Sequence, residues 1–240
     1  MSNYHRTGLA VEPVFAPSEV QHARKDISEL LDRVAGALYL NPEASMPGRQ
    51  LGERLDAVAG QSRAHADLLR RIVCFDAHRG PSLSALATSE KLRAMAQQLA
   101  GTSLTGSISR VRASFASFPE HHHPWHSDVS RVDGTACGRV RIAAWIPLGN
   151  VAAGVGGLQI LAGMRDAPLA GMSEPCFDIQ RHVGPNSQIE MPACPAGSVI
   201  FLDRFTPHRT LAVEEEARFA LVVWFTTRLT EGIDDRSCTP

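Results

Sequence analysis

The chain has 240 residues, of which 44% are hydrophobic and 20% charged, a profile typical of a globular protein that buries a sizeable core. Its 24 basic and 25 acidic residues leave a net charge of −1, which disfavours a nucleic-acid partner because phosphate binding usually needs a basic excess. No apolar run approaches the roughly 20 residues of a membrane helix and no signal pattern opens the chain, so we expect a cytoplasmic protein without a membrane partner.

The first hundred residues have the apolar periodicity and the composition of helices. Ser18 and Gln21 stand at the spacing of a capping box, directly before apolar residues that recur every three or four positions. Three helices are predicted from this pattern, at 20–38, 51–75 and 82–99. We therefore expect residues 1–101 to be mostly helical and to support the rest of the domain.

After Gly101 the periodicity changes to that of β-strands. Residues 107–115 alternate between two faces, and Arg110 and Arg112 share one of them. Six strands are predicted in all, at 107–115, 139–148, 157–161, 188–191, 198–202 and 218–226. Because no flexible linker separates helices from strands, we expect residues 1–240 to form a single domain, with helices packed outside an antiparallel sandwich or barrel at 102–230.

The segment 163–186 fits no regular element, because prolines and glycines recur along it. Loops of this length inside a compact domain are usually binding loops or lids. We predict an active-site lid here, in which Arg165 is a candidate contact for an anionic substrate. A surface excursion without function is the alternative interpretation.

The strongest local motif is Trp125-His126-Ser127-Asp128. In a strand, residues i and i+2 point to the same face, so His126 and Asp128 present an imidazole and a carboxylate side by side. A second histidine, His208, lies far along the chain. Two histidines and one carboxylate form a facial triad, which suits ferrous iron that must also hold a chelating cosubstrate and oxygen. We expect His126, Asp128 and His208 to be metal ligands and catalytic residues; ordinary surface positions are the alternative.

Arg218 is the second candidate site residue. It lies ten residues after His208, across a charged turn, and begins an apolar strand. Arg218 and Trp224 lie on the same face of that strand. An arginine among apolar residues costs free energy unless it meets an anion, and a guanidinium matches the shape of a carboxylate. A hairpin from His208 to Arg218 would bring this group towards the metal, where the distal carboxylate of a five-carbon keto acid would lie.

The chain resembles the phytanoyl-CoA dioxygenase family of iron(II)- and 2-oxoglutarate-dependent oxygenases. Residues 125–128 are similar to the W-H-S-D of its ectoine hydroxylase branch, and His208-Arg209-Thr210 is similar to the family's H-x-S/T. The resemblance extends along nearly the whole chain, through the segments 8–11, 18–20, 145–148, 156–161 and 197–201. It implies a double-stranded β-helix, a jelly-roll barrel of the cupin kind, with the helices packed outside.

The resemblance also implies roles for individual residues. His126, Asp128 and His208 would bind iron, while Arg218 and Thr210 would hold the distal carboxylate of 2-oxoglutarate. Arg110 and Arg112 lie on the strand that, in the family, helps to bind the cosubstrate or the substrate. Arg112 is favoured for the cosubstrate. The candidate substrate contacts are Arg110, Trp145, Gln159, Arg165 and Trp224, although Trp145 and Trp224 are of a residue type that more often packs in a core.

The implied activity is oxygenation of a small molecule by Fe(II), 2-oxoglutarate and O2, with ascorbate as the reductant in vitro. We expect hydroxylation of an unactivated C–H bond of an amino acid or a natural-product intermediate, with release of succinate and CO2. Desaturation, epimerisation and ring formation remain alternatives with the same cofactors. Halogenation is disfavoured because halogenating relatives replace the acidic ligand, whereas Asp128 is present.

Two other classes of function remain open. One is a non-catalytic sensor of metal and 2-oxoglutarate on the same fold, and the other is a metal-dependent enzyme that does not use 2-oxoglutarate. For the run His121-His122-His123 we expect solvent-exposed side chains or the edge of a lid. The expected assembly is a monomer or a homodimer.

Overall fold

The computed structural model describes residues 3–37, 51–76, 80–115, 118, 122–129, 131–132, 135–136, 140–164, 178–213 and 217–227. Its helices are α1 (Tyr4–Thr7), α2 (Pro17–Ala37), α3 (Leu51–Gln61), α4 (Arg63–Asp76), α5 (Pro81–Ala87), α6 (Glu90–Ala100) and the short 3-10 helix η4 (Ile179–His182). Its strands are β1 (Leu9–Pro13), β2 (Gly106–Ser114), β3 (Arg131–Val132), β4 (Thr135–Ala136), β5 (Val140–Pro147), β6 (Leu158–Ala162), β7 (Gln188–Glu190), β8 (Ser198–Asp203), β9 (His208–Thr210) and β10 (Arg218–Thr226). Within these ranges, no helix combines the length and the apolar character that crossing a membrane would require.

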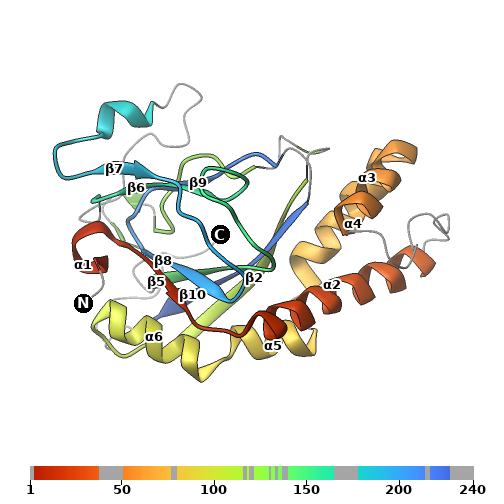
Figure 1. The fold of residues 1–240 in the computed structure, drawn as a ribbon, viewed down its shortest axis with the longest axis horizontal. Coiled ribbons are helices and arrows are strands. Elements are labelled where there is room, and N and C mark those ends of the chain that lie inside the picture. The colour runs from red at the N-terminus through yellow and green to blue at the C-terminus, as the bar shows by residue number, and fades with distance from the viewer. Residues whose placement is uncertain are drawn as a thin grey trace.

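The strands form two main antiparallel sheets. The larger has the order β1-β8-β5-β10-β2, and the smaller has the order β7-β6-β9. The six predicted strands are confirmed to within one residue at each end. The periodicity did not predict β9 or the short antiparallel pair of β3 and β4. Figure 1 shows α2, α5 and α6 along one side of the large sheet and the small sheet on its other side.

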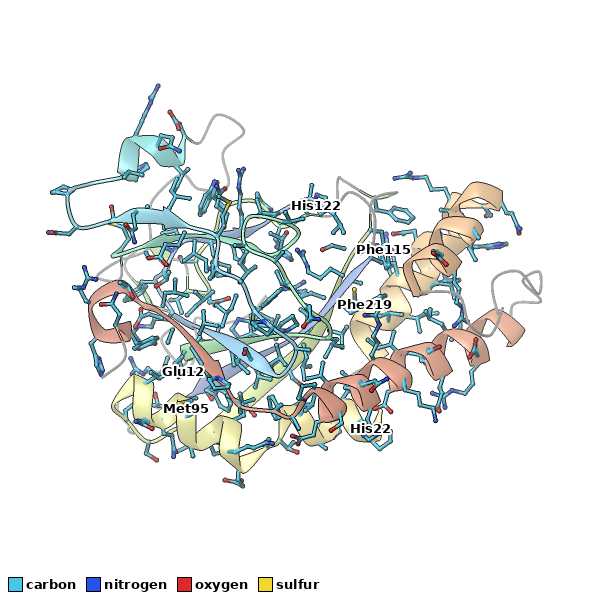
Figure 2. All side chains as sticks on the ribbon, in the orientation of Figure 1. Glu12, His22, Met95, Phe115, His122 and Phe219 are labelled. Atoms are coloured by element: carbon cyan, nitrogen blue, oxygen red, sulfur yellow. The ribbon has the colours of Figure 1, made fainter. Side chains whose placement is uncertain are left out.

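Each face of the large sheet packs against a different apolar layer. Alternate residues of β10 from Phe219 to Phe225 join the side chains of the helices in one cluster. Phe219 meets Phe115 edge to face, with ring centroids 5.7 Å apart, and both rings are labelled in Figure 2. The opposite face of β10, with Ala220 and Val222, packs against side chains of β6 in a second cluster. Strand alternation therefore separates a helix-facing layer from an interior between the two sheets.

Two of the three predicted helices are each divided in two. The prediction of one helix at 51–75 is wrong because the chain breaks at Ser62, whose hydroxyl accepts the backbone N–H of His65 at 3.3 Å as α4 begins. The prediction of one helix at 82–99 is wrong because Ser89 has an extended backbone, with φ −60° and ψ 126°, before α6. A serine ahead of a helical turn favours a new start, although apolar spacing continues across the break.

The first turn of α2 is capped by a different residue from the one predicted. Pro17 takes the first helical position, and the Glu19 carboxylate accepts the backbone N–H of Ala16 at 2.8 Å. The capping partner is therefore Glu19 and not Gln21. Glu19 also accepts from Lys91 of α6 at 2.7 Å, which ties the two helices together.

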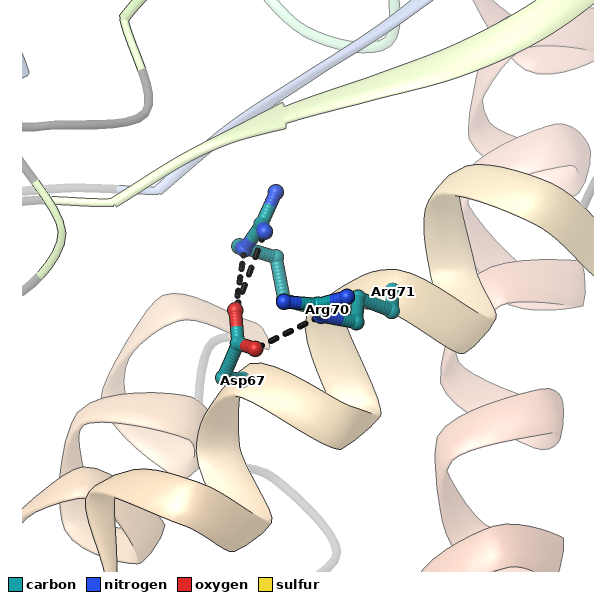
Figure 3. Close-up of polar contacts among 3 residues, drawn as sticks. All are labelled: Asp67, Arg70 and Arg71. Atoms are coloured by element: carbon teal, nitrogen blue, oxygen red, sulfur yellow. Dashed lines mark hydrogen bonds and ion pairs between the residues drawn. The ribbon is translucent and has the colours of Figure 1, made fainter.

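Charged side chains add local support on α4. Asp67 accepts from Arg70 at 3.0 Å and from Arg71 at 2.7 Å, on successive turns of the helix (Figure 3). Burial alone would raise the pKa of Asp67, but the hydrogen bonds from Arg71 and Arg70 outweigh it and lower that pKa. Pairs three and four residues apart are neighbours on a helix surface, so they stabilise α4 modestly.

The predicted lid is described at both of its ends. Residues 165–177, with the candidate Arg165, lie outside the described residues. In the later part, Ile179 of η4 is buried against Trp125 and Leu161. That part of the segment therefore packs beside the residue that precedes His126.

Candidate metal centre and neighbouring arginines

His126 and His208 lie opposite one another in a short antiparallel ladder. The N–H of His126 donates to the carbonyl of His208 at 2.9 Å, and the N–H of His208 donates to the carbonyl of His126 at 2.8 Å. Because His208 belongs to β9, this bridge attaches the segment 122–129 to the edge of the small sheet. Residues directly opposite in a ladder point to one face, and the two imidazole centroids are 4.3 Å apart.

Each imidazole is also held by a backbone carbonyl two residues before it. The Nδ1 of His126 lies 2.8 Å from the carbonyl of Pro124, and the Nδ1 of His208 lies 3.0 Å from the carbonyl of Thr206. A carbonyl oxygen can only accept, so Nδ1 donates in both rings and Nε2 is the ring nitrogen left to face a metal. The buried Thr206 is itself fixed, since its hydroxyl donates to the carbonyl of Gly8 at 3.1 Å. Both rings are therefore oriented for a metal at Nε2.

Asp128 completes the cluster. One ligand atom from each of His126, Asp128 and His208 lies within 4.8 Å of the other two. The indole N–H of Trp224 donates to Oδ1 of Asp128 at 2.6 Å, whereas Oδ2 is buried and has no hydrogen-bond partner among the described residues. A buried carboxylate oxygen without a partner is costly unless a cation meets it. The donor set thus fits a metal ion that takes two imidazoles and one carboxylate.

The surroundings keep the nearby imidazoles uncharged. Burial, and then the neighbouring His208, lower the pKa of His126 to about 3. Burial, and then Arg112, lower the pKa of His123 to about 4. A metal binds neutral imidazole, so His126 needs no deprotonation at neutral pH. His122 and His123 are both partly buried and not fully solvent-exposed, while residue 121 lies outside the described residues; the other expectation, the edge of a lid, stays a prediction.

His123 lies beside the cluster because Thr210 holds its backbone. The N–H of His123 donates to the Thr210 hydroxyl at 2.8 Å, and the N–H of Thr210 donates to the His123 carbonyl at 3.2 Å. The imidazole of His123 is 5.1 Å from that of His126 between centroids. We expected the Thr210 hydroxyl at a cosubstrate carboxylate. In the structure it contacts the backbone of the segment 122–129, which contains His126 and Asp128.

Arg218 is an enclosed guanidinium at the start of β10. Its Nη1 donates to the carbonyls of Gly157 at 3.1 Å and Leu211 at 3.4 Å, and its Nη2 donates to the Ser114 hydroxyl at 2.7 Å. The guanidinium carbon lies 5.8 Å from the ring centroid of Trp145. Burial lowers the pKa of Arg218 to about 10. Among the described residues no carboxylate forms an ion pair with it, so its charge is available to an anion.

Arg112 is a second guanidinium on the interior face of β2. It lies opposite Ala220 in the ladder, and its guanidinium carbon is 5.8 Å from the ring centroid of Trp224. No described residue hydrogen-bonds to its side chain, and burial lowers its pKa. Arg110 is on the same face two residues earlier, opposite Val222, and is exposed. Along this face the side chains pass from exposed at Arg110 to buried at Ser114, so Arg112 lies between the outside and the interior.

The structure does not bring Gln159 to the cluster. Gln159 and Arg209 pair on adjacent strands, and the Nε of Arg209 donates to the Gln159 side chain at 2.6 Å. Their strand neighbours Ile160 and His208 point the other way, into the interior, so Gln159 lies on the outer face. Trp145 is buried between the sheets, where it packs in the interior cluster.

Some contacts of the site were not predicted from the sequence. Ser114 is one, although the alternation of β2 already placed it on the face of Arg112 and its ladder partner is Arg218. The carbonyls of Pro124 and Thr206 are others, and no sequence pattern identifies a backbone acceptor. Trp224 shares a face with Arg218, as predicted, but its bond to Asp128 joins two segments whose approach depends on the tertiary fold.

A cavity of about 840 Å³ lies at the start of β10. Arg24 of α2, Asn150 and Arg218 are among the residues that line it, and the three candidate metal ligands are not. This cavity therefore does not mark the metal centre.

No family model matches this chain, and no curated protein matches its sequence. Solved structures match it over most of its length at low identity. SnoK, a non-heme alpha ketoglutarate dependent carbocyclase from nogalamycin biosynthesis, is 18% identical, with 93% of this chain and 81% of SnoK covered and a TM-score of 0.55. EvdO2 from Micromonospora carbonacea var. aurantiaca, complexed with 2-oxoglutarate, is 16% identical, with 98% and 92% covered and a TM-score of 0.55.

EctD from S. alaskensis, in its apoform, is 17% identical, with 93% of this chain and 74% of EctD covered and a TM-score of 0.57. These three proteins share the fold of this chain: antiparallel sheets with helices packed against them.

Proposed function

We propose that this protein is an Fe(II)- and 2-oxoglutarate-dependent oxygenase whose sheets form the double-stranded β-helix of the phytanoyl-CoA dioxygenase family. The observation that carries the proposal is the cluster of His126, Asp128 and His208, in which one buried carboxylate oxygen has no hydrogen-bond partner among the described residues. The likeness in fold to SnoK, which is alpha ketoglutarate dependent, supports the same class. Two imidazoles and one carboxylate leave coordination positions for a chelating cosubstrate.

In this proposal, His126 and His208 bind iron through Nε2, because both Nδ1 atoms donate to backbone carbonyls. Asp128 binds through Oδ2, since the indole of Trp224 occupies Oδ1. When bound, Fe(II) with 2-oxoglutarate supplies O2-dependent oxidation of a C–H bond, coupled to release of succinate and CO2. The chain itself supplies ligand orientation, one negative charge and an apolar cluster between the two sheets.

Arg218 holds the distal carboxylate of 2-oxoglutarate in this proposal. Its guanidinium is already oriented by Gly157, Leu211 and Ser114, so binding an anion requires little loss of side-chain entropy. A planar guanidinium matches a carboxylate with two parallel hydrogen bonds. Thr210 contributes indirectly, because its hydroxyl fixes the backbone of His123.

The substrate we propose is a small molecule that is hydroxylated, with Arg112 as the nearest side chain able to bind an anionic group of it or of the cosubstrate. Three features support this assignment: the guanidinium has no hydrogen-bond partner among the described residues, it faces the interior, and it lies next to Trp224. Arg110, on the same face and exposed, is proposed to contact the substrate closer to the surface.

The test is a pair of measurements on purified protein. The first is succinate formation from 2-oxoglutarate with Fe(II) and ascorbate. The second is anaerobic binding of 2-oxoglutarate to the Mn(II)-loaded protein, which does not need the substrate to be known. His126→Ala and His208→Ala should abolish both, whereas His22→Ala, on the exposed face of α2 (Figure 2), should leave both unchanged. Wild-type succinate formation that survives strict removal of metal would contradict the proposal.

A further inference from the structure

Trp224 joins the large sheet to a candidate metal ligand on the opposite side of the interior. It lies on β10, between Ile108 of β2 and Ala143 of β5 in the ladders. Its indole N–H donates to Oδ1 of Asp128 at 2.6 Å, and the two residues are 96 positions apart in the chain. The other two ligands belong to the edge of the small sheet, so the bond from Trp224 fixes the third ligand from a separate element.

The bond makes the two carboxylate oxygens of Asp128 different. Oδ1 already accepts a short hydrogen bond from a neutral donor, while Oδ2 is buried and has no partner among the described residues. A carboxylate without such a donor can rotate, or can bind a metal through both oxygens. With the indole in place, one lone pair of Oδ1 is already used, whereas both lone pairs of Oδ2 are free, so a cation is favoured at Oδ2.

The indole is held in position on more than one side. The ladders on both sides of β10 set its backbone, and the guanidinium carbon of Arg112 lies 5.8 Å from its ring centroid. A cation over the face of an indole is attracted to it, and this contact restricts the ring. The donor is therefore fixed before any metal arrives, which lowers the entropy lost when the site is filled.

We propose that Trp224 is a positioning residue that restricts Asp128 to binding metal through one oxygen, and so sets the affinity and the coordination number of the centre. The proposal rests on the metal site of the proposed function but not on the identity of the cosubstrate. It assigns Trp224 a role towards Asp128 in place of the substrate contact expected from the sequence. Loss of a partner that orients a metal ligand typically weakens metal binding by about 10- to 100-fold.

The experiment measures Co(II) binding to the full chain, anaerobically and without cosubstrate, by titration and by the visible spectrum of the bound ion. Trp224→Phe keeps an aromatic ring and removes the N–H. Trp224→Tyr adds a hydroxyl donor to the ring that Trp224→Phe introduces. The matched control is Phe225→Leu, one position along β10, where a buried ring faces the helices and makes no described contact with Asp128. Thermal unfolding of the metal-free variants separates a general loss of stability from a loss of metal binding.

Trp224→Phe should bind Co(II) about 10- to 100-fold more weakly, because the Asp128 carboxylate is no longer oriented. The Co(II) spectrum should also change, because both oxygens of Asp128 become free to coordinate. Trp224→Tyr should bind more tightly than Trp224→Phe, and Phe225→Leu should match wild type in affinity and spectrum. Wild-type affinity and an unchanged spectrum in both Trp224 variants would overturn the positioning role while leaving the metal site intact. Failure of the wild type to bind one Co(II) would instead overturn the proposed function.

Discussion

Replacement of Arg218 tests the proposed cosubstrate site most directly. Arg218→Met keeps a long side chain and removes the cation, whereas Arg218→Lys keeps the charge and loses the planar fork. A hydrogen bond to a charged group contributes about 1.5–3 kcal/mol, and about 1.4 kcal/mol corresponds to a tenfold change in dissociation constant. Two such bonds to a carboxylate therefore predict at least a 100-fold weaker affinity, to order of magnitude, for 2-oxoglutarate in Arg218→Met, and a loss of about tenfold in Arg218→Lys.

The same substitution should change stability much less than it changes binding. Arg218→Met removes hydrogen bonds to Gly157, Leu211 and Ser114, which destabilises the fold. It also removes a cation whose burial already lowers its pKa to about 10. Replacing a buried charge with an apolar side chain of similar length is often close to neutral, so we expect a change within about 2 kcal/mol in the free energy of unfolding.

The assay is calorimetric titration of 2-oxoglutarate into the Mn(II)-loaded variants, with urea unfolding of the same samples. Arg209→Met is the matched control, because Arg209 lies on the outer face and donates to Gln159. The control should bind 2-oxoglutarate as wild type does. An unchanged dissociation constant in Arg218→Met, with Mn(II) still bound, would refute the assignment of Arg218 to the cosubstrate.

Three further predictions test the fold and the outline of the site. Gly197→Ala should lower the free energy of unfolding in urea by about 3 kcal/mol or more, because φ is +95° and an added Cβ would collide with a backbone carbonyl. Gly154→Ala, at φ +78° with open space around it, should lower it by only about 1–2 kcal/mol. Equal losses in the two variants would contradict the collision. The hydrogen bond from Lys91, followed by that from a backbone N–H, lowers the pKa of Glu19, so its contribution is present above the ordinary pKa and disappears as pH falls through the lowered one. Glu19→Gln should therefore destabilise by about 0.5 kcal/mol at neutral pH, and this loss should shrink as pH falls through the lowered pKa; a loss that persisted in strong acid would argue against the ion pair. Gln159→Ala should leave the affinities for Mn(II) and 2-oxoglutarate unchanged, because the side chain lies on the outer face. A reduced affinity would contradict the conclusion that Gln159 lies away from the site.

The side on which each strand residue lies could be predicted from the sequence. Period-two alternation put Arg110, Arg112 and Ser114 on one face of β2, and the ladders put that face next to Arg218 and Trp224. Local periodicity contains this information because neighbouring residues determine it. Strand geometry was also the reason for expecting Asp128 beside His126, but the segment 122–129 is not a strand: His126 forms a single bridge to His208, and Asp128 lies in a bend.

Contacts between distant segments could not be predicted in the same way. The bond from Trp224 to Asp128 depends on how closely the loop before β3 approaches the large sheet. The Thr210 hydroxyl was expected at a carboxylate, but it accepts from the backbone of His123 because β9 and that loop run side by side. Gln159 was a candidate because of its motif, and only the register of β6 with β9 puts it on the outer face. Register and approach distance are tertiary properties that single-strand periodicity does not contain.

The pairing of β1 with β8 has a consequence for the order in which this protein can acquire its site during synthesis. The carbonyl of Gly8, just before β1, accepts from the N–H of Asp203 at 2.9 Å and from the hydroxyl of Thr206, whose own carbonyl orients His208. The ribosome releases β1 early, yet its partner strand emerges only after most of the chain. Until then β1 has no strand to pair with, and a nascent chain lacking β8 has no scaffold for the second histidine. Metal capture at the proposed site should therefore be among the last events of folding, and slow non-local pairing should limit its rate.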